Sequence, residues 1–148
     1  MELRRSRRYG YPLAFLIVGV DRYPATVGRL QIHQRTQIAA QLMAKINETI
    51  REIDLAAAEG LVRFHVCLPH TDFEGARLVA ERLRERLANV NPALGLSVSI
   101  GLSAGSDSDS EQSYREMLDE AYARLEHARA AGGNRVETIS MKALARAR

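Results

Sequence analysis

The sequence predicts an α/β (α+β) fold, with a single central, mostly antiparallel sheet of about five strands flanked by helices. The apolar run PLAFLIVGV at 12–20 is typical of a strand buried on both faces. Segments at 62–68 and 96–102 alternate apolar and polar residues with the period of a strand. Three further stretches repeat apolar residues every three or four positions, as one face of a helix does. Strands and helices that interleave in this order favour one sheet with helices packed on it.

The elements of the first half follow from local signals. The charged residues 2–8 are interpreted as the end of a helix, and the apolar strand comes next. Residues 21–28 contain Pro24 and form a turn. Helical spacing then runs to residue 53, through Ile38, Leu42, Ile46, Ile50 and Ile53. A hairpin is expected over 54–68, with its turn at Glu59-Gly60.

The second half begins with a helix that Thr71 opens, with Glu74 completing a capping box. A strand over 96–102, the polar loop AGSDSDSEQ and a third amphipathic helix follow, and this helix ends at Gly132-Gly133. A last short strand is expected from Val136 to Ile139. We expect the buried core to include Leu16, Val18, Phe64, Val66, Leu83, Val98, Ile100 and Leu118.

Length and composition limit the function classes. A chain of 148 residues favours one domain. The net charge of +3 is mild, and only 5% of residues are aromatic, which argues against binding a nucleic-acid polymer. The single cysteine, Cys67, excludes an internal disulfide. No apolar run is long enough to span a bilayer and no secretory leader is visible, so we expect no membrane insertion and a cytoplasmic location.

Four strings, in order along nearly the whole chain, resemble the GGDEF domain of diguanylate cyclases. They are RRYGYPLAFLIVGVDRY, FHVCLPHTDFEGARLVAERLR, LSVSIGLSAG and ARAAGGNRV. The resemblance implies a nucleotide-cyclase-like fold and one domain over 1–148. The family's first segment, with its D-x-L-T and N-R-R strings, has no counterpart here, so we expect a degenerate domain that lacks it.

The resemblance also places the family's metal and signature residues. The first metal carboxylate falls on Gly19, and only the second acid of that motif remains, as Asp21. The signature falls on residues 60–64, where Leu61 replaces the second glycine and Val62 and Arg63 replace the acids. Magnesium prefers carboxylate oxygens, so we expect no metal and no cofactor here.

The nucleotide-binding positions of the family differ as well. The two guanine-reading residues fall on Val27 and Thr36, and the two phosphate-binding residues fall on Arg129 and Gly133. Family members join two GTP molecules into cyclic di-GMP. Without the metal and guanine residues, we expect this domain not to be an enzyme.

One family feature is retained, the R-x-x-D string that binds the product and inhibits. It stands here as Arg51 to Asp54, five residues before Gly60, and a further family arginine falls on Arg82. Guanidinium groups can meet phosphates and stack on purines, so cyclic di-GMP is one expected ligand. Two alternatives stay open. Arg51 and Asp54 can be an ordinary i,i+3 pair at a helix end, and the domain can be a nucleotide-free module that forms a homodimer or pairs with another signalling protein.

Overall fold

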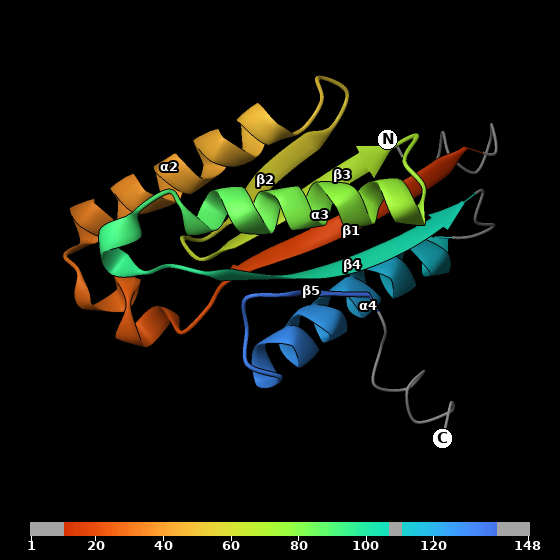
Figure 1. Cartoon of the computed structure of the whole chain (residues 1–148). Coiled ribbons are helices and arrows are strands. Elements are labelled where there is room, and N and C mark those ends of the chain that lie inside the picture. The colour runs from red at the N-terminus through yellow and green to blue at the C-terminus, as the bar shows by residue number, and fades with distance from the viewer. Residues whose placement is uncertain (1–10, 107–110, 139–148) are drawn as a thin grey trace.

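One five-stranded sheet forms the centre of the computed structural model, which describes residues 11–106 and 111–138 (Figure 1). The strand order is β2-β3-β1-β4-β5, and every neighbouring pair is antiparallel except β4 and β5. The strands are β1 (Pro12–Val20), β2 (Leu55–Glu59), β3 (Arg63–Pro69), β4 (Val98–Ser106) and β5 (Val136–Glu137). The predicted fold class is confirmed.

Helices cover both faces of this sheet. α2 (Ile32–Thr49) and α3 (Phe73–Ala88) lie on one face, and α4 (Glu111–Ala130) lies on the other (Figure 1). The apolar run of β1 is continuous because both of its faces are buried. Leu16 and Val18 join the core under α2 and α3, whereas Ile17 packs with Ala121 and Leu125 of α4.

The core prediction is right for seven of its eight residues. Leu16, Val18, Phe64, Val66, Leu83, Val98 and Ile100 are all at most 1% exposed. Leu118 is the exception, because it is only partly buried, at the margin of the two small clusters under α4. The helical spacing correctly placed Leu118 on the side of α4 that faces the sheet. It could not show that the sheet leaves Leu118 partly uncovered.

Gly101 determines how closely α4 approaches the sheet. A Cβ atom built at Gly101 would lie 1.9 Å from the carbonyl oxygen of Ala121 and 2.5 Å from the backbone nitrogen of Leu125. Only a residue without a side chain can therefore stand at this point of β4.

The helix expected to reach residue 53 ends earlier. α2 stops at Thr49, and Ile50 has an extended backbone with φ −88° and ψ 166°. A tight turn follows, in which the backbone nitrogen of Asp54 donates to the carbonyl of Arg51. Ile53 is 53% exposed and does not continue the apolar stripe. The apolar spacing runs past the real end of α2 because the apolar residues of the following turn have the same spacing by chance.

The expected capping box of the next helix is wrong as well. Asp72, not Thr71, caps α3, and its carboxylate accepts from the backbone nitrogen of Gly75 at 2.8 Å. The Thr71 hydroxyl instead donates to the carbonyl of Pro69 at 3.0 Å. The helix expected at residues 2–8 and the end of the last strand lie outside the described residues. Among the residues that are described, no helix has the length and hydropathy needed to cross a membrane.

Candidate functional site

The R-x-x-D string forms a compact turn just after α2, and a buried carboxylate organises it. The Asp54 side chain is 1% exposed and accepts from the Arg51 backbone nitrogen at 2.8 Å. The same carboxylate accepts from Nε of Arg51 at 3.2 Å and from Nη2 at 2.9 Å. Because these donors all come from Arg51, Asp54 fixes both the turn and the direction of the guanidinium group.

Arg51 also ties this turn to the start of α3. Its Nη2 atom donates to the carbonyl of Pro69 at 2.7 Å and to the hydroxyl of Thr71 at 2.6 Å. The hydrogen bond that Arg51 donates to Asp54 raises the pKa of Arg51, and partial burial opposes this only in part. Among the described contacts, none involves Nη1, and the side chain remains 51% exposed. Asp54, Pro69 and Thr71 therefore hold the guanidinium in place, while about half of the side chain is exposed.

The Asp54 carboxylate faces Arg51 and not the solvent. It is buried because Arg51 covers it on two sides, which the i,i+3 spacing could not show. Thr71 is a residue of this arrangement that the sequence did not assign. The only sequence signal at this position was the hydroxyl group of Thr71, which could have capped α3 but does not.

Arg82 lies farther along the same side of the molecule. Arg86, one turn later in α3, donates from Nη1 to the Thr49 hydroxyl at 3.2 Å. The end of α2 therefore lies along α3, because Thr49 contacts Arg86 and Arg51 contacts Thr71, just before α3 begins. In the sequence, Arg82 lies between Thr71 and Arg86. We call the line where the end of α2 meets α3 the α2–α3 seam.

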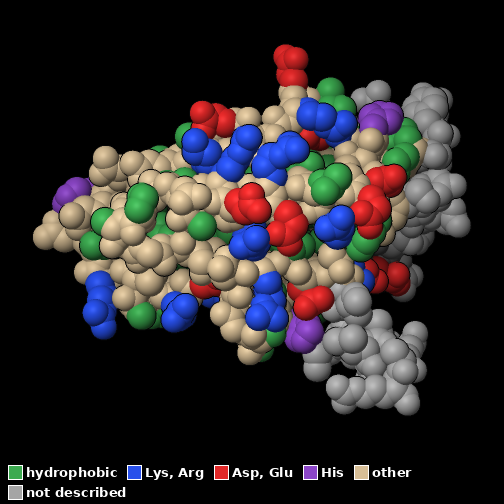
Figure 2. Space-filling view, viewed as in Figure 1, with side chains coloured by type: hydrophobic (Ala, Val, Ile, Leu, Met, Phe, Trp, Pro, Cys, Tyr) green, Lys and Arg blue, Asp and Glu red, His purple; other side chains and the backbone are tan. Residues whose placement is uncertain are grey.

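Arg82 is exposed and makes no hydrogen bond or ion pair with Arg51 or Asp54 among the described residues. It follows Thr71 by eleven positions, about 16 Å along a helix axis. Figure 2 shows Lys and Arg side chains gathered where α2 and α3 meet. The cations of the α2–α3 seam are therefore spread along it and do not form a single cluster.

A second region lies at the opposite end of the sheet, around the positions to which the resemblance assigns the family's metal and phosphate residues. Gly19 faces α4, and a Cβ atom there would lie 3.2 Å from the methyl groups of Leu125. Gly133 has a φ of 74°, and a Cβ atom there would lie 2.8 Å from Cγ of Asp21. Side chains at these two positions would therefore disturb the packing that the chain has adopted.

Asp21, the carboxylate that remains here, is used inside the protein. It is 6% exposed, and it accepts from the hydroxyl of Ser97 at 2.6 Å and from that of Ser99 at 2.7 Å. It also accepts from the backbone nitrogen of Asn134 at 2.8 Å. Asp21 therefore ties the end of β1 to the start of β4 and to the loop after α4.

The groups around Asp21 are mainly basic. A depression of about 330 Å³ is lined by Asp21, Arg22, Arg129 and two glycines. Glu126 lies 3.6 Å from Arg63 and 3.5 Å from Arg129, so it is shared between two guanidinium groups. The described residues hold no group of three His, Cys, Asp or Glu side chains that could bind a metal ion. These residues do not fit the magnesium ions that the family uses.

A comparison with known protein families supports the resemblance seen in the sequence. The family described as "Diguanylate cyclase, GGDEF domain" matches residues 1–135. The chain belongs to this family.

One curated relative of this GGDEF domain matches most of the chain at low identity. The protein YhcK of Bacillus subtilis, described as uncharacterized, is 27% identical over 130 residues, which cover 85% of this chain and 36% of YhcK. The chain thus spans about a third of the length of that relative.

Two solved structures show the same fold. Diguanylate cyclase SiaD of Pseudomonas aeruginosa, in complex with its activator SiaC, has a TM-score of 0.82 at 22% identity, over 93% of this chain and 54% of that one. The coiled coil and GGDEF domain of DgcB from Caulobacter crescentus, in complex with c-di-GMP, has a TM-score of 0.79 at 17% identity, over 93% and 75%.

The GGDEF domain has one more polar cluster, which the sequence did not predict. Nε2 of His65 lies 2.8 Å from Glu59 Oε1 and 2.8 Å from the hydroxyl of Tyr122, and this hydroxyl donates to Glu59 at 2.8 Å. The guanidinium of Arg63 lies 5.4 Å from the ring centre of Tyr122. The hydrogen bonds from His65 and Tyr122 lower the pKa of Glu59. The cluster joins the signature hairpin to α4.

Proposed function

We propose that this GGDEF domain binds cyclic di-GMP at the α2–α3 seam and does not synthesise it. The observation that carries the proposal is the state of Arg51. Its guanidinium is oriented by the buried Asp54, Nη1 makes none of the described contacts, and half of the side chain is exposed. A cation held in this way can meet a phosphate without first losing much conformational entropy.

The chemistry of the seam suits a ligand with two phosphates. Arg51 stands at one point of the seam, and Arg82 with Arg86 stands farther along α3. Guanidinium forks bind phosphate oxygens and stack on purine faces. The c-di-GMP complex of DgcB supports this choice of ligand for a domain of the same fold. Asp54 would act as a positioning residue, because its oxygens are already taken by Arg51.

Calorimetry with cyclic di-GMP tests this proposal. The parent domain is expected to bind at micromolar concentration, and the affinity should fall as salt rises because exposed charges are screened. Arg51→Ala should weaken binding at least tenfold, and Arg51→Lys should weaken it similarly because an ammonium cannot form a fork. Arg115→Ala removes an exposed arginine of α4, on the opposite layer, and should have no effect.

Two results would contradict binding at the seam. One is the absence of heat with micromolar cyclic di-GMP on a folded sample. The other is an Arg51→Ala variant that binds as tightly as the Arg115→Ala control. Asp54→Asn should also weaken binding, because a carboxamide oxygen holds a guanidinium less firmly than a carboxylate does.

The absence of synthesis rests on the residues at the metal positions. Gly19, Val62 and Arg63 cannot supply carboxylates, and Asp21 is engaged by Ser97 and Ser99. Incubation with GTP and magnesium or manganese, followed by chromatography, should yield no cyclic di-GMP. Val62→Asp alone should not create activity, since position 19 would still lack its acid. Product above a protein-free control would refute this part of the proposal.

An interaction module is the second candidate function. Four large apolar side chains are exposed in the segments that border the seam, namely Ile53, Leu55, Phe73 and Leu78, at 41–59%. Exposed apolar groups that gather on one surface are typical of protein interfaces. Light scattering after size-exclusion chromatography, without nucleotide, should show a homodimer in this case, and Leu78→Glu should return it to a monomer. A monomer that binds cyclic di-GMP would exclude a homodimer formed through these side chains.

A further inference from the structure

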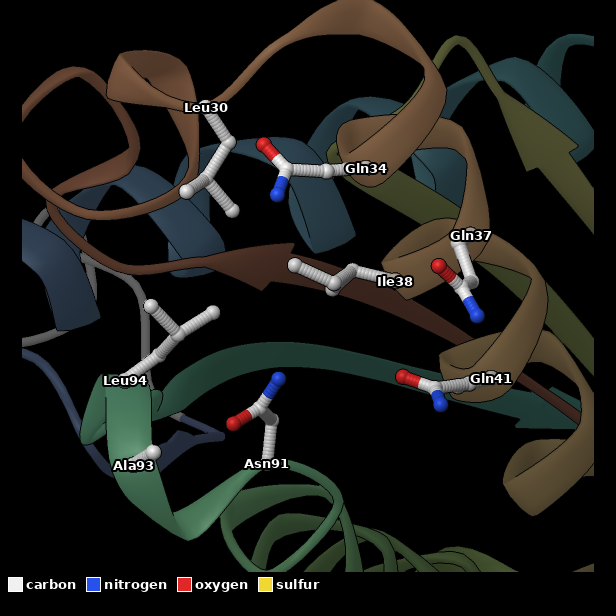
Figure 3. Close-up of a pocket in the computed structure, with 8 residues that line it drawn as sticks. All are labelled: Leu30, Gln34, Gln37, Ile38, Gln41, Asn91, Ala93 and Leu94. Carbon is white, nitrogen blue, oxygen red and sulfur yellow. The ribbon is translucent and has the colours of Figure 1, made fainter.

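A pocket of about 360 Å³ lies beside the first half of α2, away from the seam (Figure 3). One wall is a flank of α2 that carries Gln34, Ile38 and Gln41. The facing wall is the connection from α3 to β4, which includes Asn91 and the short 3-10 turn η3 (Pro92–Leu94). Spacings of four and three residues bring the three α2 side chains onto one flank of the helix.

The apolar side chains gather at one end of the pocket, where the carboxamide of Gln34 also lies (Figure 3). Leu30, Ile38 and Leu94 converge on one end, where Ile38 is 5% exposed (Figure 3). The carboxamides of Gln41 and Asn91 point toward one another from opposite walls at the other end (Figure 3). The pocket thus offers an apolar surface for the face of a ring and polar groups for its edge.

The polar groups are uncharged, and two of them lack partners. Within the described part of the chain, the carboxamides of Gln41 and Asn91 make no hydrogen bond, whereas Gln34 accepts from the backbone nitrogen of Gln31 at 3.1 Å. The lining contains no charged side chain. Nothing in it compensates a phosphate or a carboxylate, so the group that enters is uncharged. Each carboxamide provides both donors and an acceptor.

We propose that this pocket binds an adenine ring, as in an uncharged adenine nucleoside. The edge of adenine places a donor, N6, beside an acceptor, N7, and one Asn or Gln carboxamide matches that pair with two hydrogen bonds. Guanine presents two acceptors, O6 and N7, on the same edge. A carboxamide has an acceptor of its own and cannot donate to both with its two ends. Guanine matches one carboxamide at its other edge, where O6 lies beside the N1–H donor, but adenine has such a donor–acceptor pair on both edges, N6 with N7 and N6 with N1. Because Gln41 and Asn91 approach from opposite walls, both can pair with adenine but only one can pair with guanine, and the apolar end stacks against the ring.

This site is separate from the positions at which the family reads guanine. Val27 is 2% exposed within the core, and Thr36 lies about 200° around α2 from Ile38, on another flank. It is separate from the seam too, because Gln41 precedes the end of α2 by eight residues, about 12 Å. The inference goes beyond the proposed function and does not depend on it.

Titration of the full chain with adenosine, followed by nitrogen–proton NMR, tests the proposal. The side-chain NH₂ signals of Gln41 and Asn91 report on the carboxamides directly and are expected to shift and saturate. Gln41→Leu should weaken adenosine binding roughly tenfold, in line with the discrimination that a bidentate pair provides. Asn47→Leu is the matched control, because Asn47 is another exposed carboxamide of α2 that does not line the pocket. Both positions are exposed and leucine favours helix, so both variants should fold.

Guanosine is expected to bind roughly tenfold more weakly than adenosine. Arg51→Ala should leave adenosine binding unchanged, which separates this site from the seam. Failure of the Gln41 and Asn91 signals to respond up to the solubility limit of adenosine would overturn the proposal. Equal affinity for guanosine, or equal effects of Gln41→Leu and Asn47→Leu, would overturn it as well.

Discussion

Replacing Asp21 with alanine removes the acceptor that joins the end of β1, the start of β4 and the loop after α4. Three donors lose their partner, the hydroxyls of Ser97 and Ser99 and the backbone nitrogen of Asn134. A hydrogen bond to a charged group contributes about 1.5–3 kcal/mol. Ser99 is fully buried, but Asn134 is exposed and can use water instead. We therefore expect Asp21→Ala to cost about 3 kcal/mol in total, below the simple sum.

Thermal unfolding of the variant measures this cost. In a chain of this size, 1 kcal/mol corresponds to about 2–4 °C in Tm, so Tm should fall by about 6–12 °C. Asp72→Ala is the matched control, since Asp72 is an exposed acid whose carboxylate accepts one hydrogen bond, from the backbone nitrogen of Gly75 at 2.8 Å. Loss of such a helix cap costs about 1 kcal/mol. If Asp21→Ala lowers Tm no more than the control does, Asp21 is not the structural link described here.

Two further predictions concern packing and pH. Gly101→Ala should destabilise the fold by about 3 kcal/mol or more in urea unfolding. Gly105→Ala is the control and should be nearly neutral, because its Cβ would meet a flexible methionine side chain at 3.3 Å. Equal costs for the two variants would contradict the close approach of α4 at Gly101. The lowered pKa of Glu59 gives stability that is present above the ordinary glutamate pKa and is lost as pH falls through the lowered value. Burial and the bond to Glu59 raise the pKa of Tyr122, so its contribution is present below about pH 10 and lost above the raised value. The free energy of unfolding, measured across pH, should depend less on acid in Glu59→Gln and less on alkali in Tyr122→Phe. Unchanged pH profiles in these variants would argue against the cluster.

The sequence predicted elements best where one face is clearly buried. Both faces of β1 are buried, and one face of β3 is buried. The apolar patterns of these two strands therefore left little choice of register. Predictions failed at the ends of helices. Ile53 continued the spacing of α2 by chance, and Thr71 matched a capping pattern that Asp72 fulfils instead. Local patterns do not show which of two neighbouring polar side chains a distant residue will engage.

Of the candidate seam residues, Arg51 and Asp54 could be found from one short string, because their contact is local. Their environment could not. Thr71 accepts from Arg51 across twenty positions, and the burial of Asp54 depends on that approach. Arg82 could be assigned to α3 but not placed relative to Arg51, since this depends on how α3 crosses the end of α2.

The sequence by itself determined the order of strands and helices, membership of the GGDEF family and the residue types at the metal positions. These depend on local patterns and on the identity of single residues. Only the tertiary structure decided that Asp21 is an internal link and that Asp54 orients Arg51. It also decided that Gln41 and Asn91, fifty positions apart, face one pocket. The physical reason is that hydrogen-bond partners and burial are set by segments that packing brings together, and no local pattern records which segments meet.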